Sequence, residues 1–193
     1  TLLLAGCAPA STPTPSPGAG QALTPAPVST ELPASAAITL TDGLGRSVAL
    51  NEAAQRVISL APSNTEILFA IGAGDQVVGR DTLSDYPEAA KNVKDIGSMF
   101  EAMNTELIVS LKPDLVIAAE VNTPEQVNAL EDLGLTVYYL KNPATLEEMY
   151  TNLEIVSQLT GHEAEATALI ESLKARVAAV DEKLLPISSR FSV

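Results

Sequence analysis

The sequence predicts an α/β fold in which a mostly parallel sheet carries helices on both faces. From residue 56 onward, short apolar runs typical of strands alternate with longer segments of helical periodicity. Residues that favour turns or helix caps stand at most of the boundaries. Because strands that alternate with helices are joined by crossovers, neighbouring strands should be parallel. We therefore expect a Rossmann-like sheet, with a β-hairpin before it and a long helix after it.

The expected elements follow one another along the chain. Runs of alternating polarity at 38–41 and 47–50 flank the turn sequence Asp42-Gly43-Leu44-Gly45 and predict the hairpin. Further strands are expected at 56–60, 76–80, 114–118 and 136–140. Helices are expected from Ser63 to Gly72 or Gly74, over 105–111, from Pro124 to Gly134, from Thr145 to about Leu159, and from about residue 161 to about Leu184. The last helix carries one apolar stripe, Leu169, Leu173, Val177, Val180 and Leu184, and a new strand is expected to begin after Pro186.

Helix starts are predicted from cap residues. In a capping box, a Ser or Thr side chain and a Glu or Gln side chain three residues later each accept the other residue's backbone N–H. The candidate pairs are Ser63 with Glu66, Thr123 with Gln126, Thr145 with Glu148, and Thr160 with Glu163, and Asn104 is expected to cap the helix that follows it.

The N-terminal segment is typical of a surface lipoprotein. Residues 1–7 look like the end of a signal peptide that runs into a lipobox, Leu4-Ala5-Gly6-Cys7, in which the Cys7 thiol accepts lipid. Residues 8–36 are nearly all Ala, Ser, Thr, Pro and Gly, with only Glu31 charged. Such a stretch buries too little surface to offset its conformational entropy, which predicts a disordered linker. The alternative is a stray cysteine in an apolar segment.

Composition excludes several classes of function. With 24 acidic against 11 basic residues, the chain carries a net charge of −13, so a phosphate backbone is repelled and no nucleic-acid partner is expected. Cys7 and His162 are the only residues of their kinds. A zinc or iron–sulfur site needs a cluster of such ligands, so we expect no metal and no cofactor. His162 lies between two helical patterns, where it is unsuited to Ser-His-Asp catalysis.

Four segments, in this order, resemble the substrate-binding proteins of vitamin B12 and ferric-siderophore ABC importers, the vitamin B12 branch most closely. They are Val57–Glu66 (VISLAPSNTE), Ser84–Pro87 (SDYP), Met103–Glu106 (MNTE) and Leu111–Val116 (LKPDLV). The resemblance implies two α/β lobes joined by one long helix, with the ligand between the lobes. The chain would then supply the first lobe (37–160), the interlobe helix (161–185) and the start of a truncated second lobe (186–193), so that most of the second lobe is missing.

The resemblance also implies roles for three residues. Glu66 matches a glutamate that docks onto arginines of the membrane permease, although its place in a capping box offers a purely structural role. Tyr86 and Phe100 match aromatic positions that line the ligand cleft, and the alternative for both is ordinary core packing. Both fall in loop-like sequence after predicted strands, where α/β sheets bind ligands.

Two departures bear on the ligand. Where the vitamin B12 branch has a further tryptophan, this chain has Ala119 followed by Glu120, which removes a stacking surface and adds a carboxylate. A catecholate siderophore would need a basic pocket, and Arg80 is the basic residue that stands out near the expected cleft.

The function that follows is the lipid-anchored, extracytoplasmic substrate-binding component of an ABC importer. Its partners would be the permease with its ATPase, a corrinoid or ferric chelate, and the membrane through the lipid, and the protein is expected to act as a monomer. The alternative from another class is a surface lipoprotein enzyme on a Rossmann-like fold. Against that alternative, no Gly-x-Gly-x-x-Gly follows a strand, and Gly72-Ala73-Gly74 follows a predicted helix.

Overall fold

The computed structural model describes residues 37–98, 100 and 103–188. The predicted anchor segment 1–7, the linker 8–36 and residues 189–193 lie outside the described residues. The strands are β1 (Ile38–Thr41), β2 (Ser47–Leu50), β3 (Val57–Ser59), β4 (Val77–Arg80), β5 (Leu115–Ala119) and β6 (Val137–Leu140). The α-helices are α1 (Pro62–Ala70), α2 (Thr105–Ser110), α3 (Pro124–Glu131), α4 (Leu146–Thr160) and α5 (Glu163–Ser188), and two 3-10 turns are η1 (Ala73–Gln76) and η2 (Glu88–Asn92).

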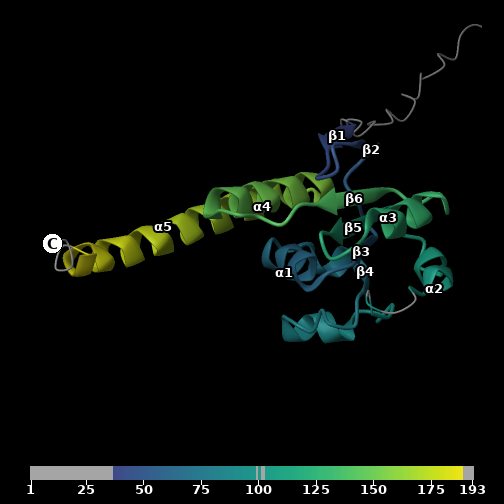
Figure 1. Cartoon of the computed structure of the whole chain (residues 1–193), viewed down its shortest axis with the longest axis horizontal. Helices are drawn as coiled ribbons and strands as arrows, with labels where there is room; N and C mark the ends of the chain where they lie inside the picture. The colour runs from purple at the N-terminus through teal and green to yellow at the C-terminus, as the bar shows by residue number, and fades with distance from the viewer. Residues whose placement is uncertain (1–36, 99, 101–102, 189–193) are drawn as a thin grey trace, which may run out of the picture. The chain divides into compact units, whose positions relative to one another are not determined.

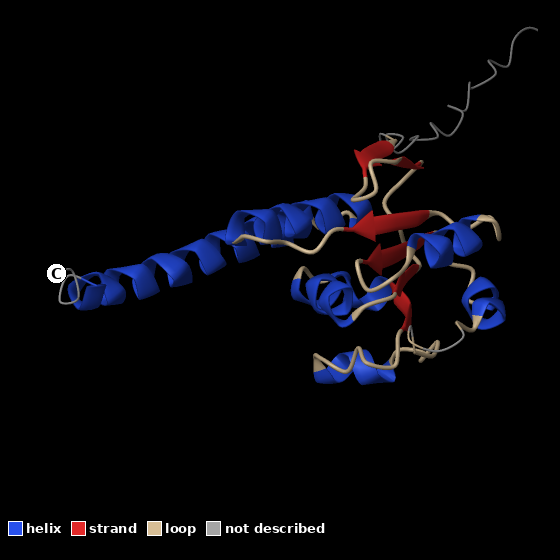
Figure 2. Ribbon diagram, viewed as in Figure 1, coloured by secondary structure: helices blue, strands red, loops and turns tan. Residues whose placement is uncertain are grey.

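Four strands form one parallel sheet, as the alternation of strands and helices predicted. Their order is β4-β3-β5-β6, and β3 pairs with both β4 and β5 (Figure 2). β1 and β2 form the predicted antiparallel hairpin. Because all four strands of the main sheet run in one direction, their carboxyl ends meet along a single edge.

Helices cover both faces of the sheet, each face with its own buried cluster (Figure 1). One cluster packs α1, α4 and the first half of α5 against the sheet, and its members in these helices are Leu68, Tyr150, Leu153, Val156, Leu159, Ala166 and Ile170. The other packs α2 and α3 through Ile108, Val127 and Leu130. The four strands are buried on both faces and consist almost entirely of apolar residues, as expected for a covered parallel sheet.

The structure confirms three of the predicted caps. Asn104 and Thr145 accept the backbone N–H of Leu107 and Glu148 at 3.0 and 3.1 Å. Thr123 and Gln126 form a complete capping box at the start of α3.

Two of the predicted capping boxes are wrong. α1 begins earlier than expected, with Ala61 as the N-cap and Pro62 in the first turn, and no side chain caps it. Proline is well suited to the first helical position, which moves the helix start ahead of Ser63. Thr160 belongs to the end of α4, where its hydroxyl donates to the carbonyl of Val156 at 2.8 Å. Gly161 then ends α4 in the left-handed conformation.

The last helix is longer than predicted. α5 continues to Ser188, so 186–188 are helical and do not begin a strand. Ala166 and Ile170 are buried against the lobe, whereas Val180 and Leu184, on the predicted apolar stripe, are about half exposed. No helix in the described part of the chain has both the length and the apolar character that crossing a bilayer requires.

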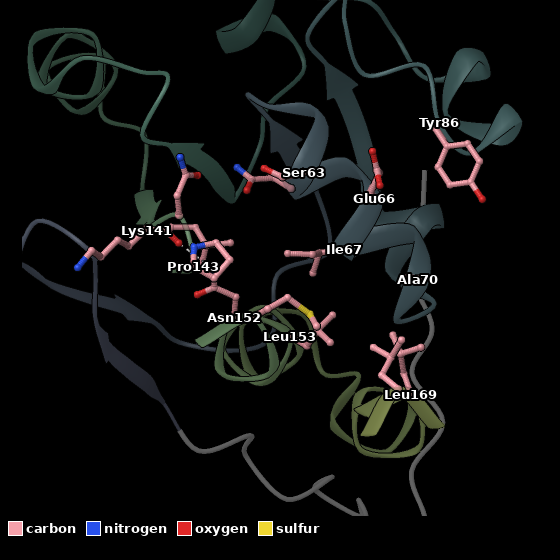
Figure 3. Close-up of a pocket in the computed structure, with 15 residues that line it drawn as sticks. Ser63, Glu66, Ile67, Ala70, Tyr86, Lys141, Pro143, Asn152, Leu153 and Leu169 are labelled. Carbon is pink, nitrogen blue, oxygen red and sulfur yellow. Dashed lines mark hydrogen bonds between the residues drawn. The ribbon is translucent and has the colours of Figure 1, made fainter. Parts of the chain in front are cut away.

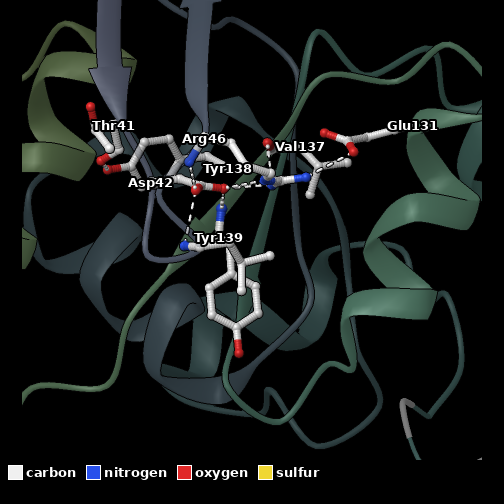
Figure 4. A network of polar contacts seen from close by, with 8 residues as sticks. Thr41, Asp42, Arg46, Glu131, Val137, Tyr138 and Tyr139 are labelled. Carbon is white, nitrogen blue, oxygen red and sulfur yellow. Dashed lines mark hydrogen bonds and ion pairs between the residues drawn. The ribbon is translucent and has the colours of Figure 1, made fainter.

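A buried carboxylate joins the hairpin to the outer strand of the sheet (Figure 4). The Asp42 carboxylate accepts from the Arg46 Nε at 2.9 Å and from the backbone N–H of Tyr139 at 3.3 Å. The Gly43 N–H donates to the Tyr139 carbonyl at 2.8 Å, and Arg46 also pairs with Glu131 of α3 at 2.8 Å. These bonds occupy the open edge of β6, which would otherwise present unpaired backbone groups.

Burial and neighbouring charges shift the pKa values of two residues in this network, Asp42 and Tyr138. Burial by itself raises the pKa of Asp42, but hydrogen bonds from Arg46 and from the Leu44 N–H outweigh it, so the pKa lies below the ordinary 3.8. Burial, reinforced by the charge of Asp42, raises the pKa of Tyr138 to about 12, and the Tyr138 hydroxyl donates to the Thr41 carbonyl at 2.9 Å. The Asp42 side chain is therefore ionised near neutral pH, which is the form that accepts the hydrogen bonds of the hairpin turn.

We expect Asp42→Asn to lower the free energy of unfolding by about 3 kcal/mol near neutral pH, because it leaves Arg46 partly unpaired in a buried site. A depressed pKa stabilises the fold above its unfolded value of 3.8, and this contribution is lost as the pH falls through the folded value. The gap between wild type and variant in urea titrations should therefore narrow below about pH 4. The exposed Asp132→Asn is the control, and an equal loss there would contradict the assignment.

Candidate ligand-binding site

The carboxyl edge of the sheet carries a pocket of about 300 Å³, here called the edge pocket. Segments that follow all four strands contribute to it, as the parallel arrangement requires. Its lining residues are Leu60, Ala61, Pro62, Ser63, Asp81, Leu83, Phe100, Ala119, Val121 and Asn142. Most of these are apolar and none is a lysine or arginine, so the pocket offers contact area more than charge.

A second pocket of about 370 Å³, the helix pocket, lies between α1, α4 and α5 (Figure 3). Its lining residues are Ser63, Asn64, Glu66, Ile67, Ala70, Tyr86, Leu140, Lys141, Asn142, Pro143, Met149, Asn152, Leu153, Leu169 and Leu173. It shares Ser63 and Asn142 with the edge pocket, so the two are adjacent. Small-molecule sites have this character, with an apolar lining and a few polar groups that orient the ligand.

The two predicted aromatic residues are exposed, and each lines one pocket. Tyr86 is 67% exposed and borders the helix pocket, whereas Phe100 is 73% exposed and borders the edge pocket. The alternative of ordinary core packing is therefore wrong for both. The peptide bond between Tyr86 and Pro87 is cis. Exposed rings beside an apolar pocket provide faces on which a flat ligand can stack.

Glu66 is exposed on α1 at the border of the helix pocket. Figure 3 shows its carboxylate directed away from Leu153 and Leu169, which form the opposite wall. Since α1 has no side-chain cap, the capping role considered for Glu66 is not filled. The carboxylate is therefore available for an external partner.

Arg80, the basic residue that stands out near the expected cleft, is not available to a ligand. The residue is only 8% exposed, and its guanidinium donates to the carbonyls of Asp81, Thr82 and Ala90 at 2.9, 3.3 and 3.0 Å. The other departure is placed as the sequence suggested: Ala119 lines the edge pocket and Glu120 after it is exposed.

Several lining residues were not anticipated from the sequence. Leu83, Val121 and Asn142 are ordinary loop residues, and what marks them is their position directly after β4, β5 and β6. Leu169 and Leu173 were read only as part of an apolar helix stripe, yet both reach the helix pocket. The loop residues could have been identified from their position after the strands. The contribution of α5 to the helix pocket could not, because it depends on how α5 packs against α4.

The described residues contain no catalytic or metal-binding cluster. No group of three His, Cys, Asp or Glu side chains there could hold a metal ion. The Nδ1 of His162 lies 3.0 Å from the Thr160 carbonyl oxygen, and in the described part of the chain no serine or carboxylate hydrogen-bonds to its ring.

Comparison with known proteins agrees with this geometry. The family model described as periplasmic binding protein matches residues 57–186. The chain belongs to this family. An uncharacterized ABC transporter substrate-binding lipoprotein of Bacillus subtilis (strain 168), YvrC, is 35% identical over 154 residues, which cover 78% of this chain and 48% of that protein.

Two further members of the periplasmic binding protein family are named for their ligands. The vitamin B12-binding protein of Vibrio campbellii is 37% identical over 134 residues, covering 69% of this chain and 48% of that protein. The crystal structure of a periplasmic heme binding protein from Pseudomonas aeruginosa matches with a TM-score of 0.65 and 26% identity, covering 72% of this chain and 50% of that one. The chain thus spans about half the length of the relatives it matches.

Proposed function

We propose that this protein is the extracytoplasmic substrate-binding component of an ABC importer. The observation that carries the proposal is the edge pocket, to which the carboxyl ends of all four parallel strands contribute and beside which the Phe100 ring stands exposed. Open α/β sheets bind ligands at this edge. Membership of a family of binding proteins favours this function over the surface-enzyme alternative.

We propose a corrinoid as the ligand class, ahead of a ferric siderophore. The edge pocket is walled by apolar side chains, and its one acid, Asp81, is occupied by the hydroxyl of Ser84. With Arg80 also occupied, the edge pocket has no cation to meet a polyanionic catecholate. A macrocycle with an apolar face and little net negative charge suits these walls. Heme, bound by one structural relative, is the competing ligand.

We further propose a lipid anchor and a permease contact for the whole protein. Cys7 lies outside the described residues, and its lipidation rests on the lipobox and on a relative named as a lipoprotein. Glu66 is exposed, and no basic side chain pairs with it in the described part of the chain. Complementary charge orients such encounters, so this carboxylate is suited to meet permease arginines. The permease with its ATPase would then be the partners of a monomeric binding protein.

The ligand proposal is tested by titrating the full-length protein with cyanocobalamin, dicyanocobinamide, hemin and a ferric catecholate. We expect the corrinoids to bind, and Tyr86→Ala and Phe100→Ala each to weaken binding by roughly tenfold. Because both rings are exposed, neither change should lower the melting temperature appreciably. Leu153→Ala, in the wall of the helix pocket but only 3% exposed, is the stability control and should cost about 2–5 kcal/mol. Binding of the catecholate alone would refute the corrinoid assignment.

The docking proposal predicts that Glu66→Lys impairs uptake by roughly tenfold while ligand affinity is kept, since attraction to permease arginines becomes repulsion. Uptake of labelled ligand by whole cells measures the first quantity, and calorimetry the second. Glu106→Lys is the matched comparison, because Glu106 is likewise an exposed glutamate on a helix of the described part of the chain. If Glu106→Lys alone impairs uptake, docking belongs to α2 and not to Glu66.

The anchor proposal predicts that Cys7→Ser moves the protein from the membrane fraction to the soluble fraction, because the thiol that accepts lipid is lost. Fractionation of cells that express the full-length protein, followed by immunoblotting, measures this distribution. A variant that stays with the membranes would place the anchor elsewhere in the protein.

A further inference from the structure

The open edge of β4 is occupied by a short segment that follows η2. Residues 94–96 lie parallel to the end of β4: the Arg80 N–H donates to the Lys94 carbonyl and the Ile96 N–H to the Arg80 carbonyl, both at 2.9 Å. Two loops therefore leave the sheet side by side. One, 81–87, carries Tyr86, and the other begins at Gly97 and leads to Phe100.

The Arg80 side chain binds the first loop and the segment from which the second loop starts. Its Nη1 donates to the carbonyls of Asp81 and Thr82 at 2.9 and 3.3 Å, its Nε donates to the Ala90 carbonyl at 3.0 Å, and Nη1 lies 3.6 Å from the Asp95 carboxylate. One planar guanidinium thus serves the first loop, the turn η2 and the segment beside β4. A lysine has the same charge but not this fork of fixed donors.

Two aspartates complete the connection between the loops. Asp95 accepts from the Thr82 hydroxyl at 2.9 Å and from the Gly97 N–H at 2.8 Å, and the Thr82 N–H donates to the Gly97 carbonyl at 3.1 Å. Asp81, which is buried, accepts from the Leu83 N–H at 3.1 Å and from the Ser84 hydroxyl. Every one of these bonds lies within four residues of Tyr86 or Phe100, or joins the segments that carry them.

We propose that Arg80 is a positioning residue for ligand binding, which fixes Tyr86 and Phe100 beside the two pockets before the ligand arrives. The inference rests on the proposed binding function but assigns Arg80 a role other than contact with the ligand. Rings that are exposed gain little from core packing, so their placement depends on the backbone beneath them. Preorganised contacts raise affinity because less ordering is left to occur on binding.

Arg56 provides a matched control at the opposite end of β3. Its guanidinium also donates to backbone carbonyls, those of Leu111 and Lys112, with the Nε–Lys112 distance at 3.0 Å. It stands at the amino edge of the sheet, away from both pockets. Arg56→Lys therefore makes the same chemical change as Arg80→Lys without touching the two loops.

The first measurement is hydrogen–deuterium exchange on the full-length protein without ligand. Arg80→Lys should speed exchange in peptides that cover 81–86 and 94–97, where the amides of Leu83, Ser84, Ile96 and Gly97 are bonded, and leave α3 and α4 unchanged. Arg56→Lys should leave both loop peptides at the wild-type rate. Uniformly faster exchange, or no change in the loops, would overturn the proposal. If Arg80→Lys does not fold, Thr82→Val removes one bond to Asp95 and should loosen the same peptides.

The second measurement is a double-mutant cycle on affinity, with cyanocobalamin and hemin in parallel as probes. Arg80→Lys should weaken binding about tenfold, the size of one displaced aromatic contact. In a Tyr86→Ala/Phe100→Ala background the same change should weaken binding less than about twofold, because both rings that it positions are gone. Equal effects in both backgrounds would show that Arg80 does not act through the two rings. Failure of both probes with wild type would refute the proposed corrinoid ligand and its heme alternative, whereas the exchange result still decides the positioning.

Discussion

The common direction of the four central strands is the constraint on which the rest of the structure depends. Parallel strands bring their carboxyl ends together, so the loops after β3, β4, β5 and β6 must meet at one edge. The edge pocket is the space that these loops leave between them. The same arrangement leaves β4 and β6 as outer strands, whose free backbone groups need partners. The segments that pair with the outer edges of β4 and β6 therefore differ in how near they bring their side chains to the edge pocket.

The two outer strands are covered by different means with different consequences. Beside β6, the turn of the hairpin supplies the buried Asp42, whose bonds to Tyr139 and Arg46 attach the start of the folded chain to the sheet. Beside β4, the segment 94–96 pairs with the strand through backbone bonds, and the Asp95 side chain connects it to Thr82 and Arg80. The hairpin turn beside β6 contributes to stability at a distance from the proposed ligand site. The segment 94–96 beside β4 adjoins the loops that carry the exposed aromatic residues, so at that edge stability and the proposed ligand contacts depend on the same bonds.

Local signals in the sequence were sufficient for most of the fold. The hairpin turn, the capping box at Thr123 and the glycine that ends α4 each act within a few residues, and the structure has all three. The errors arose where one pattern fitted two positions. Thr160 stands three residues before Glu163, yet its hydroxyl bonds within α4 because Gly161 ends that helix after it. The environment of Arg80 could not be predicted, since its burial depends on a segment that reaches β4 only through tertiary structure.

Under the proposed function, the two pockets and their exposed rings form one part of the surface that contacts the ligand. Tyr86 and Phe100 leave most of their ring surface exposed, whereas ligand sites usually bury 70–90% of a small molecule. The chain spans about half the length of its relatives, and on α5 the apolar residues Val180 and Leu184 remain exposed beyond the half that packs on the lobe. Under the proposed function, the parallel edge and the Arg80 bonds determine where the two rings stand before a ligand arrives.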